Sequence, residues 1–227
     1  MLVAHERVIL PELLEHASPE EAKENLQDLV RINRYFGGYR ILRGMVNQFV
    51  ASSDAFSLLD VGAASGDMGT ALSQSYPRAT IVSLDRSLTH LGEATEPRVA
   101  SDAFQLPFAA ASFDFVFSSL FLHHFSDDQI VELLREFQRV SRRAVLAIDL
   151  ERGPLAYHFL PATRWLFGWH SISMHDGPIS VQAAFKKEEL LALAVRAGLL
   201  GAHVKTHRPW ARLSLLAPLG TGKASNH

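Results

Sequence analysis

The chain has 227 residues, of which 48% are hydrophobic and 20% are charged, and its formal net charge at pH 7 is −2. This composition excludes an intrinsically disordered protein, which needs few apolar residues and a high net charge. The length suits one domain with room for an insertion. The 22 Lys and Arg residues against 24 Asp and Glu residues argue against a nucleic-acid-binding protein, which would be basic.

The chain contains no cysteine, so disulfides, thiolate zinc sites, iron–sulfur clusters and cysteine nucleophiles are excluded. Its eleven His residues show no H-E-x-x-H or comparable ligand spacing, and we expect no metal. No apolar stretch reaches the roughly 18 residues of a membrane span. Residues 1–10 include two charges and lack the apolar run of a signal peptide, so we expect a cytoplasmic protein.

Residues 1–52 predict a helical lid. Residues 18–21 combine a cap residue, a proline at the first helical position and acids in the first turn. Apolar residues then recur at helical spacing until Gly37 and Gly38 break the run, and a second helix follows. The charged residues around this break either form a solvated helix face or contribute to an anionic ligand site.

Short apolar runs alternate with helical patterns between residues 56 and 150. The runs are SLLDVG, ATIVSLD, RVASDA, FDFVFSSLF and RRAVLAIDL, and the helical patterns cover residues 67–76, 87–96 and 127–140. Such alternation is typical of a parallel sheet covered by helices on both faces. A helix at 186–197 and two further strands end the domain, which we place at 53–217, and 218–227 reads as a flexible tail.

Residues 151–182 interrupt this alternation with aromatic residues, His, Gly and Pro. An insertion after the fifth strand would lie over the ligand crevice of an open α/β sheet. The alternative is a helical hairpin that packs its aromatic side chains into the core.

A loop of small residues, DVGAASG at 60–66, follows the first predicted strand. Small residues let a ligand approach the backbone closely, and the N–H groups of the next helix favour negative charge. The spacing resembles D-x-G-x-G-x-G, the first motif of class I S-adenosylmethionine-dependent methyltransferases, with Ala64 in place of the middle glycine. A nicotinamide-dependent oxidoreductase would instead need a glycine at Asp67.

Later segments strengthen the resemblance. Asp85 ends the second strand, DAFQLPF at 102–108 is similar to the family's D-A-x-x-L-P-F segment, and SFDFV at 112–116 is similar to S-F-D-x-V. The resemblance implies a Rossmann-like, doubly wound, mainly parallel seven-stranded sheet with the helical lid and the insertion added. It also implies that S-adenosylmethionine is the cofactor.

The resemblance further implies which residues hold that cofactor. Asp85 would accept hydrogen bonds from the ribose hydroxyls and Asp102 would bind the adenine amino group, although each acid could also serve only a strand end or a turn. The implied set is Asp60, Gly62, Ala63, Ala64, Gly66, Asp85, Arg86, Asp102, Ala103, Phe104, Ser118 and Ser119.

Four residues are candidates for removing a proton from a methyl acceptor. His123 and His124 follow the fourth strand, and one of them could instead be a packing or capping residue. His175 next to Asp176 in the insertion would suit a general base, although Asp-Gly-Pro is also turn chemistry. We expect residues 151–182 and 35–43 to cover the acceptor, with His175 and Asp176 as the best-matched pair.

The sequence therefore predicts a methyltransferase acting on an apolar or phenolic small molecule, with O-methylation favoured. C-methylation of a quinone-like or polyketide ring is an alternative. A nicotinamide-dependent oxidoreductase and a non-catalytic cofactor-binding protein are alternatives of other classes. The charge balance and the absence of an N-P-P-Y-like segment argue against a nucleic-acid acceptor.

Overall fold

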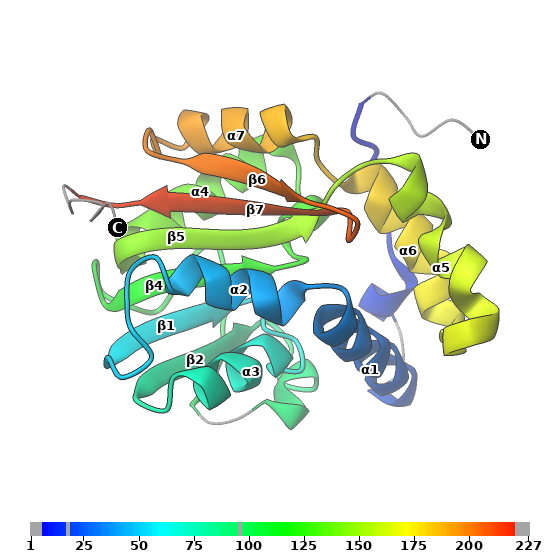
Figure 1. The fold of residues 1–227 in the computed structure, drawn as a ribbon, viewed down its shortest axis with the longest axis horizontal. Coiled ribbons are helices and arrows are strands. Elements are labelled where there is room, and N and C mark those ends of the chain that lie inside the picture. The colour runs from blue at the N-terminus through cyan, green and yellow to red at the C-terminus, as the bar shows by residue number, and fades with distance from the viewer. Residues whose placement is uncertain (1–5, 17–18, 95–96, 221–227) are drawn as a thin grey trace.

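The computed structural model describes residues 6–16, 19–94 and 97–220, and one seven-stranded sheet forms its centre (Figure 1). The strands are β1 (Phe56–Val61), β2 (Ala79–Asp85), β3 (Arg98–Ala100), β4 (Phe113–Ser119), β5 (Ser141–Leu150), β6 (His203–His207) and β7 (Arg212–Pro218). Their order is β3-β2-β1-β4-β5-β7-β6. The first five strands are parallel, and β7 runs antiparallel to both neighbours. This is the predicted doubly wound, mainly parallel α/β architecture.

The helices follow the predicted order. They are α1 (Pro19–Tyr35), α2 (Gly38–Val46), α3 (Asp67–Ser75), α4 (Asp127–Val140), α5 (Pro154–Phe167), α6 (Ser171–Ala183) and α7 (Lys187–Arg196), with short 3-10 turns η1 (Leu13–His16), η2 (His90–Glu93) and η3 (Leu122–His124). Within the described part, 87–94, of the helix predicted at 87–96, only η2 forms, because a glycine lies within this segment and a proline follows it.

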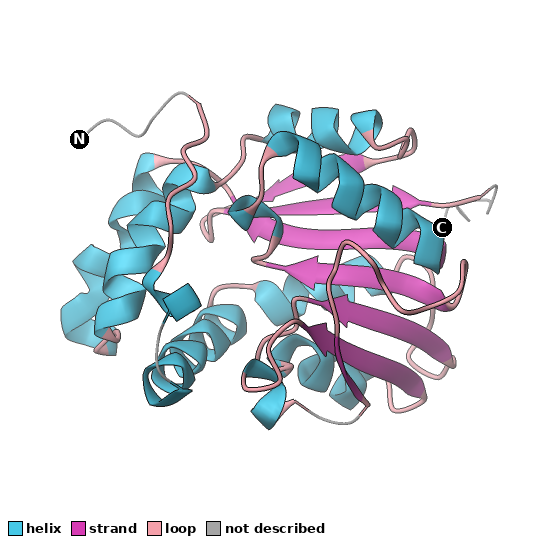
Figure 2. Ribbon diagram, turned by 180° about the vertical axis from the view of Figure 1, so that it is seen from behind, coloured by secondary structure: helices cyan, strands magenta, loops and turns pink. Residues whose placement is uncertain are grey.

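Helices cover both faces of the sheet. On one face α2 and α3 bury residues such as Leu42 and Leu72 against β1, β4 and β5. On the other face α4 and α7 bury Phe137 and Leu190 (Figure 2). Because the central strands are covered on both sides, they read as continuous apolar runs rather than as alternating patterns.

The insertion forms a helical hairpin, α5 and α6, beyond the carboxyl ends of the parallel strands (Figure 1). Its aromatic residues pack against the lid helix α1. The ring of Phe36 lies edge-on to Phe159 at 4.7 Å and to Phe167 at 5.8 Å between centroids. The hairpin therefore packs Phe159 and Phe167 against the end of the lid, whereas Trp165 is exposed, and it lies beyond the carboxyl ends of the strands.

The first described segment, residues 6–16, runs along α6. The Val8 N–H donates to the Gln182 carbonyl at 3.1 Å. The Arg7 guanidinium donates to the carbonyls of Ala183 at 2.8 Å and Phe125 at 2.9 Å. These bonds connect the segment to the insertion and to the loop after β4, an arrangement that no sequence pattern indicated.

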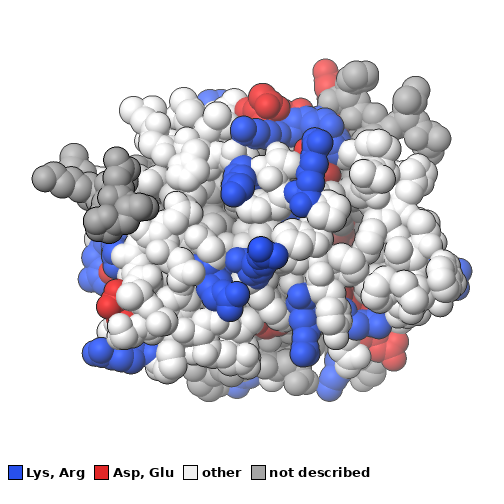
Figure 3. All heavy atoms as spheres, viewed as in Figure 1, with Lys and Arg blue, Asp and Glu red and all other residues white. Residues whose placement is uncertain are grey.

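Two further observations concern a membrane span and a basic surface. No helix among the described residues is long and apolar enough to cross a membrane. On the face shown in Figure 3, the described Lys and Arg side chains lie in small groups with uncharged surface between them, so this face carries no continuous basic stripe.

The flexible tail is predicted at 218–227, but Pro218 still belongs to β7, and residues 221–227 lie outside the described part.

Two glycines at α2 should respond oppositely to alanine. Gly37 has φ +86°, and a Cβ there would lie 2.5 Å from the Trp210 ring, whereas Gly44 has open space around it. We expect Gly37→Ala to lower the melting temperature through left-handed strain of about 1–2 kcal/mol plus the clash. Gly44→Ala should raise stability by about 0.5–1 kcal/mol. Equal melting temperatures for the two variants would contradict this account of the α1–α2 junction.

Candidate active site

The loop between β1 and α3 turns sharply at the carboxyl edge of the sheet. Gly62 and Gly66 have φ of 71° and 68°, and Ala64 has φ 47°. Alanine thus adopts the left-handed conformation at the position where the resembling motif has glycine, a geometry that costs a non-glycine residue about 1–2 kcal/mol. The loop keeps its turn despite the replacement.

Asp85 holds this loop in place from the end of β2. Its carboxylate accepts the Ala64 N–H at 3.1 Å and the Ser87 N–H at 2.9 Å. Burial alone would raise the pKa of Asp85, but hydrogen bonds from His90, Ser87 and Ala64 outweigh it and leave the pKa below its usual value. Asp85 is therefore an ionised acceptor beside the loop, as a ribose-binding role requires.

Three buried polar atoms at the carboxyl ends of β1 and β4 have no hydrogen-bond partner among the described residues. They are Oδ2 of Asp60 and the hydroxyl oxygens of Ser118 and Ser119. Burial, followed by the nearby carboxylates of Asp67 and Asp85, raises the pKa of Asp60 to about 8. Because buried polar groups are nearly always satisfied in folded proteins, this group of atoms indicates a polar ligand.

Aromatic rings border the same loop. A Cβ on Gly62 would lie 2.4 Å from the ring of Phe121. Phe121 and Phe125 lie 4.9 Å apart between centroids, and Phe125 and Phe104 lie 5.5 Å apart. Phe104 follows β3, where its N–H donates to Asp102 at 2.9 Å. Asp102 and Arg86 are exposed, and Ala103 is half-buried.

The lid is connected to the loop through Asp67, the first residue of α3. Its carboxylate accepts hydrogen bonds from the Asn33 amide at 3.1 Å and the Tyr39 hydroxyl at 3.0 Å. A cavity of about 830 Å³ between α1, α3 and η2 reaches this point from outside. Residues of α1 and α2 are thus hydrogen-bonded to the first residue of the helix that follows the loop.

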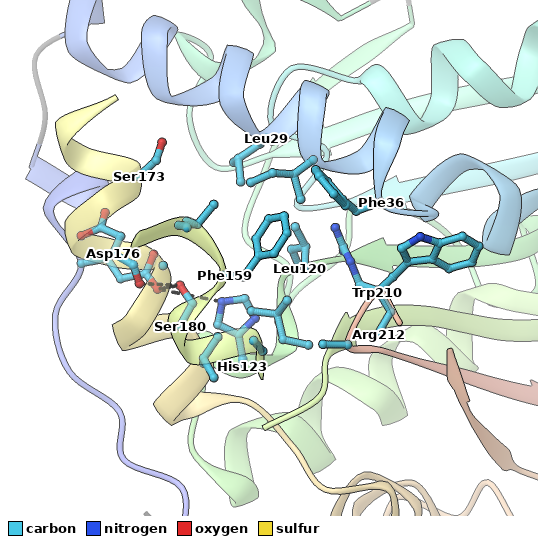
Figure 4. A pocket seen from close by; sticks show the side chains of 18 of the residues that line it. Leu29, Phe36, Leu120, His123, Phe159, Ser173, Asp176, Ser180, Trp210 and Arg212 are labelled. Carbon is cyan, nitrogen blue, oxygen red and sulfur yellow. Dashed lines mark hydrogen bonds and ion pairs between the residues drawn. The ribbon is translucent and has the colours of Figure 1, made fainter. Parts of the chain in front are cut away.

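A second cavity, of about 500 Å³, lies beyond the carboxyl ends of β4 and β5, and we call it the acceptor cavity (Figure 4). Most of its wall is apolar. It is lined by Glu12, Leu14, Asn25, Leu29, Ile32, Tyr35, Phe36, Leu120, His123, His124, Leu150, Leu155, Ala156, Phe159, Leu160, Ser173, Asp176, Gly177, Ser180, Val181, Pro209, Trp210, Ala211 and Arg212. The insertion and the start of the 35–43 segment both contribute to this lining, and residues 6–16 contribute as well.

His123 forms the polar end of this cavity together with Asp149, the penultimate residue of β5. The imidazole Nδ1 lies 2.7 Å from Oδ1 of Asp149, and both side chains are buried. Burial would lower the pKa of His123, but Asp149 and Glu12 outweigh it and leave the pKa above its usual value. Asp149 also accepts the N–H groups of Leu122 at 3.0 Å and Leu150 at 2.8 Å, so its orientation is fixed.

Glu12 lies opposite this pair. Its Oε1 is 3.9 Å from Nε2 of His123 and 3.9 Å from Nδ1 of His124, and it accepts the Ser180 hydroxyl at 2.5 Å. Burial, with a smaller contribution from His123, lowers the pKa of His124 to about 3. Potential metal-ligand atoms of Glu12, His123 and His124 lie within 4.8 Å of one another. The centroids of the two imidazole rings are 4.2 Å apart, and the ring planes are inclined by 32°.

Of the other predicted catalytic pair, only one residue lines the acceptor cavity. His175 and Asp176 lie in α6 rather than in a turn, with Nδ1 of His175 2.9 Å from Oδ1 of Asp176. The His175 side chain is 50% exposed, and it does not line the acceptor cavity. Asp176 does line the cavity, and its carboxylate accepts the N–H groups of Leu13 and Leu14 at 2.9 and 3.0 Å. Asp176 therefore anchors the N-terminal segment.

Sequence reasoning missed three polar residues of the acceptor cavity and its surroundings. Glu12 and Arg212 lie far from the motifs in the chain, and no local pattern indicates that they line the same cavity as His123. Asp149 is a lone acid near the end of an apolar run in the sequence. An acid at the carboxyl end of a strand in an open α/β sheet is a signal for a ligand-site residue and could have identified Asp149.

Comparisons with known proteins identify a similar domain and similar folds. Residues 59–148 match the family model described as methyltransferase domain. A malonyl-acyl-carrier-protein O-methyltransferase from Legionella pneumophila is 34% identical over 91 residues, which span 37% of this chain and 31% of that protein. A SAM-dependent methyltransferase from Aquifex aeolicus is 16% identical with a TM-score of 0.62, covering 90% of this chain and 100% of the other. Human N-acetylserotonin methyltransferase in complex with SAM is 19% identical with a TM-score of 0.63, covering 88% and 57%.

The family match and the geometry agree. Residues 59–148 match a methyltransferase domain, as the motifs predict, and the fold is that of solved proteins described as S-adenosylmethionine-dependent methyltransferases. The unsatisfied atoms at β1 and β4, the anionic Asp85 and the left-handed loop fit the polar groups of S-adenosylmethionine.

The raised pKa of Asp60 has a consequence for stability in the protein without cofactor. The unfolded chain releases this proton near the usual value of 3.8, whereas the folded protein keeps it until about pH 8. The unfolding free energy should therefore fall as pH rises between these values. We expect Asp60→Asn to gain melting temperature relative to wild type from pH 5 to pH 8 and to gain no more above. A pH-independent difference between the two melting curves would contradict this.

Proposed function

We propose that this protein transfers the methyl group of S-adenosylmethionine to a hydroxyl oxygen of an apolar small molecule. The observation that carries the proposal is the acceptor cavity. Its walls are mostly apolar, and its polar end at His123 adjoins the loop that follows β4. Such a cavity suits a hydrophobic body with one reactive polar group. The match to a protein named as an O-methyltransferase is a further support.

The cofactor residues proposed from the motifs lie together at one edge of the sheet. The loop 62–66 would hold the amino-acid part, Asp85 the ribose hydroxyls, and the segment 102–104 the adenine. Asp60, Ser118 and Ser119 supply the buried polar atoms beneath. Arg86 is exposed and makes no hydrogen bond among the described contacts, so we propose no direct contact for it.

The cofactor supplies an electrophilic methyl group on sulfur. The apolar wall of the cavity excludes water and orients the acceptor, which is the main catalytic contribution available to the protein. As the new oxygen–carbon bond forms and the carbon–sulfur bond breaks, the acceptor hydroxyl gives up its proton. We propose His123 as the base, because Asp149 fixes its Nδ1 and directs Nε2 to the cavity side. His124 is the weaker base, since burial lowers its pKa to about 3.

The cofactor assignment can be tested by calorimetry with S-adenosylhomocysteine. We expect Asp85→Ala to weaken binding by roughly tenfold or more, because it removes charge-assisted hydrogen bonds worth about 1.5–3 kcal/mol. Asp128→Ala serves as the control, since that acid is exposed on α4. Equal affinity of wild type and Asp85→Ala would reject the ribose assignment.

The acceptor assignment can be tested by screening phenols and apolar alcohols for S-adenosylhomocysteine release. With any accepted substrate, His123→Gln should lower kcat by about 10²–10⁴-fold, the usual effect of losing a general base, with unchanged cofactor affinity. His175→Gln is the matched control and should retain the wild-type rate, because its side chain lies outside the cavity. The reverse result would restore the His175–Asp176 pair as the base. If wild type binds cofactor and methylates no hydroxyl compound, O-methylation is rejected.

A further inference from the structure

Arg212 is the one positively charged residue of the acceptor cavity that the proposed reaction leaves unused. It begins β7, next to the carboxyl end of β5, and is 1% exposed. Among the described residues its guanidinium makes one hydrogen bond, from Nη2 to Oδ1 of Asn33 at 3.3 Å. Nη1 has no partner and is shielded from solvent. A group with five donors in a fork geometry is thus almost unsatisfied in the protein interior.

A second arginine of the same chain shows how a structural guanidinium is satisfied. Arg152 is also fully buried, and it donates to both carboxylate oxygens of Glu189 at 3.0 and 2.6 Å and to the Ala184 carbonyl at 2.5 Å. Arg212 has no comparable carboxylate contact in the described part of the chain. The carboxylates of Asp149 and Asp67 act on it only at longer range.

The charge on Arg212 persists despite its burial. Burial lowers the pKa of Arg212 to about 10, and Asp149 and Asp67 oppose this decrease. The guanidinium is therefore protonated at neutral pH, and a buried charge without a contacting counter-ion is costly. Arginine is also the residue best suited to bind a carboxylate with two parallel hydrogen bonds.

We propose that Arg212 binds a carboxylate carried by the methyl acceptor, so that the acceptor is an apolar organic acid. Arg212 and Trp210 lie on one side of the acceptor cavity, and Ser180 and Asp176 lie on the other (Figure 4). The apolar body would fill the cavity between these two sides. This inference rests on the proposed function and adds the substrate class to it.

The test compares acids with their neutral amides in calorimetry, with S-adenosylhomocysteine present. The probes are 6-hydroxy-2-naphthoate against 6-hydroxy-2-naphthamide, and decanoate against decanamide. Wild type should bind at least one acid roughly 10–100-fold more tightly than its amide, which is the fold-change expected for hydrogen bonds to a charged group. If no acid binds more tightly than its amide, the inference is overturned. Since no turnover is measured, this result leaves the methyl-transfer proposal standing.

Arg212→Met should reduce the preference for the acid to about twofold or less and leave amide affinity unchanged. Arg208→Met is the matched control, because this arginine lies four positions earlier, in the loop before β7, with an 81% exposed side chain. A preference that survives Arg212→Met, or that disappears equally in Arg208→Met, overturns the inference. Replacing a buried charge by an apolar side chain is often tolerated. Should Arg212→Met fail to fold, Arg212→Lys keeps the charge without the fork and should weaken the preference without abolishing it.

The cofactor carries a carboxylate of its own, and a further measurement separates the two sources. S-adenosylhomocysteine has this carboxylate, whereas 5′-methylthioadenosine lacks it. Both should bind Arg212→Met as they bind wild type. A loss of affinity confined to S-adenosylhomocysteine would assign Arg212 to the cofactor and overturn the acceptor assignment.

Discussion

The buried carboxylate of Asp149 is the interaction on which the acceptor side of the molecule depends. A negative charge this deep must be satisfied completely, and it accepts hydrogen bonds from the Leu122 and Leu150 backbone and from the His123 ring. Those bonds fix the loop after β4 against the end of β5. They also fix which nitrogen of His123 faces the cavity, where Glu12 of the N-terminal segment meets it. One acid thus sets the relative positions of two strands, a loop and the first segment of the chain.

The cofactor side is organised differently. There the sheet edge supplies buried polar atoms without a partner among the described residues, while backbone turns provide the shape. Asp85 fixes the loop after β1, and Asp67 connects that loop to the lid through Asn33 and Tyr39. Asn33 also accepts a hydrogen bond from Arg212. A single lid residue therefore contacts both halves of the site, which gives a direct route by which occupancy of one half could affect the other.

The sequence predicted the fold well because the relevant signals are local. The central strands β1, β4 and β5 are mostly apolar runs, and α4 has a capping box at Ser126 and Gln129. The residues proposed for the cofactor come from the same local signals, since Asp60, Asp85 and Ser119 lie at or near the carboxyl ends of strands. The acceptor cavity was not predictable, because Glu12, His123, Ser180 and Arg212 come from four distant parts of the chain. His175 beside Asp176 had the right chemistry, but the helical phase of α6 turns it outward, and a proline within the segment favoured a turn over the helix that forms.

The residues that line the acceptor cavity are far apart in the chain, which affects the order in which parts of the protein can fold. Residues 56–119 supply four neighbouring parallel strands, whose partners are much nearer in the chain than Val8 is to Gln182. The cavity closes only after β7 has paired with β5 and residues 6–16 have docked on α6. Contacts of long sequence separation form late because their loop entropy must be overcome first. An acceptor analogue should therefore bind only to fully folded molecules, whereas a cofactor analogue could already recognise a partly assembled chain.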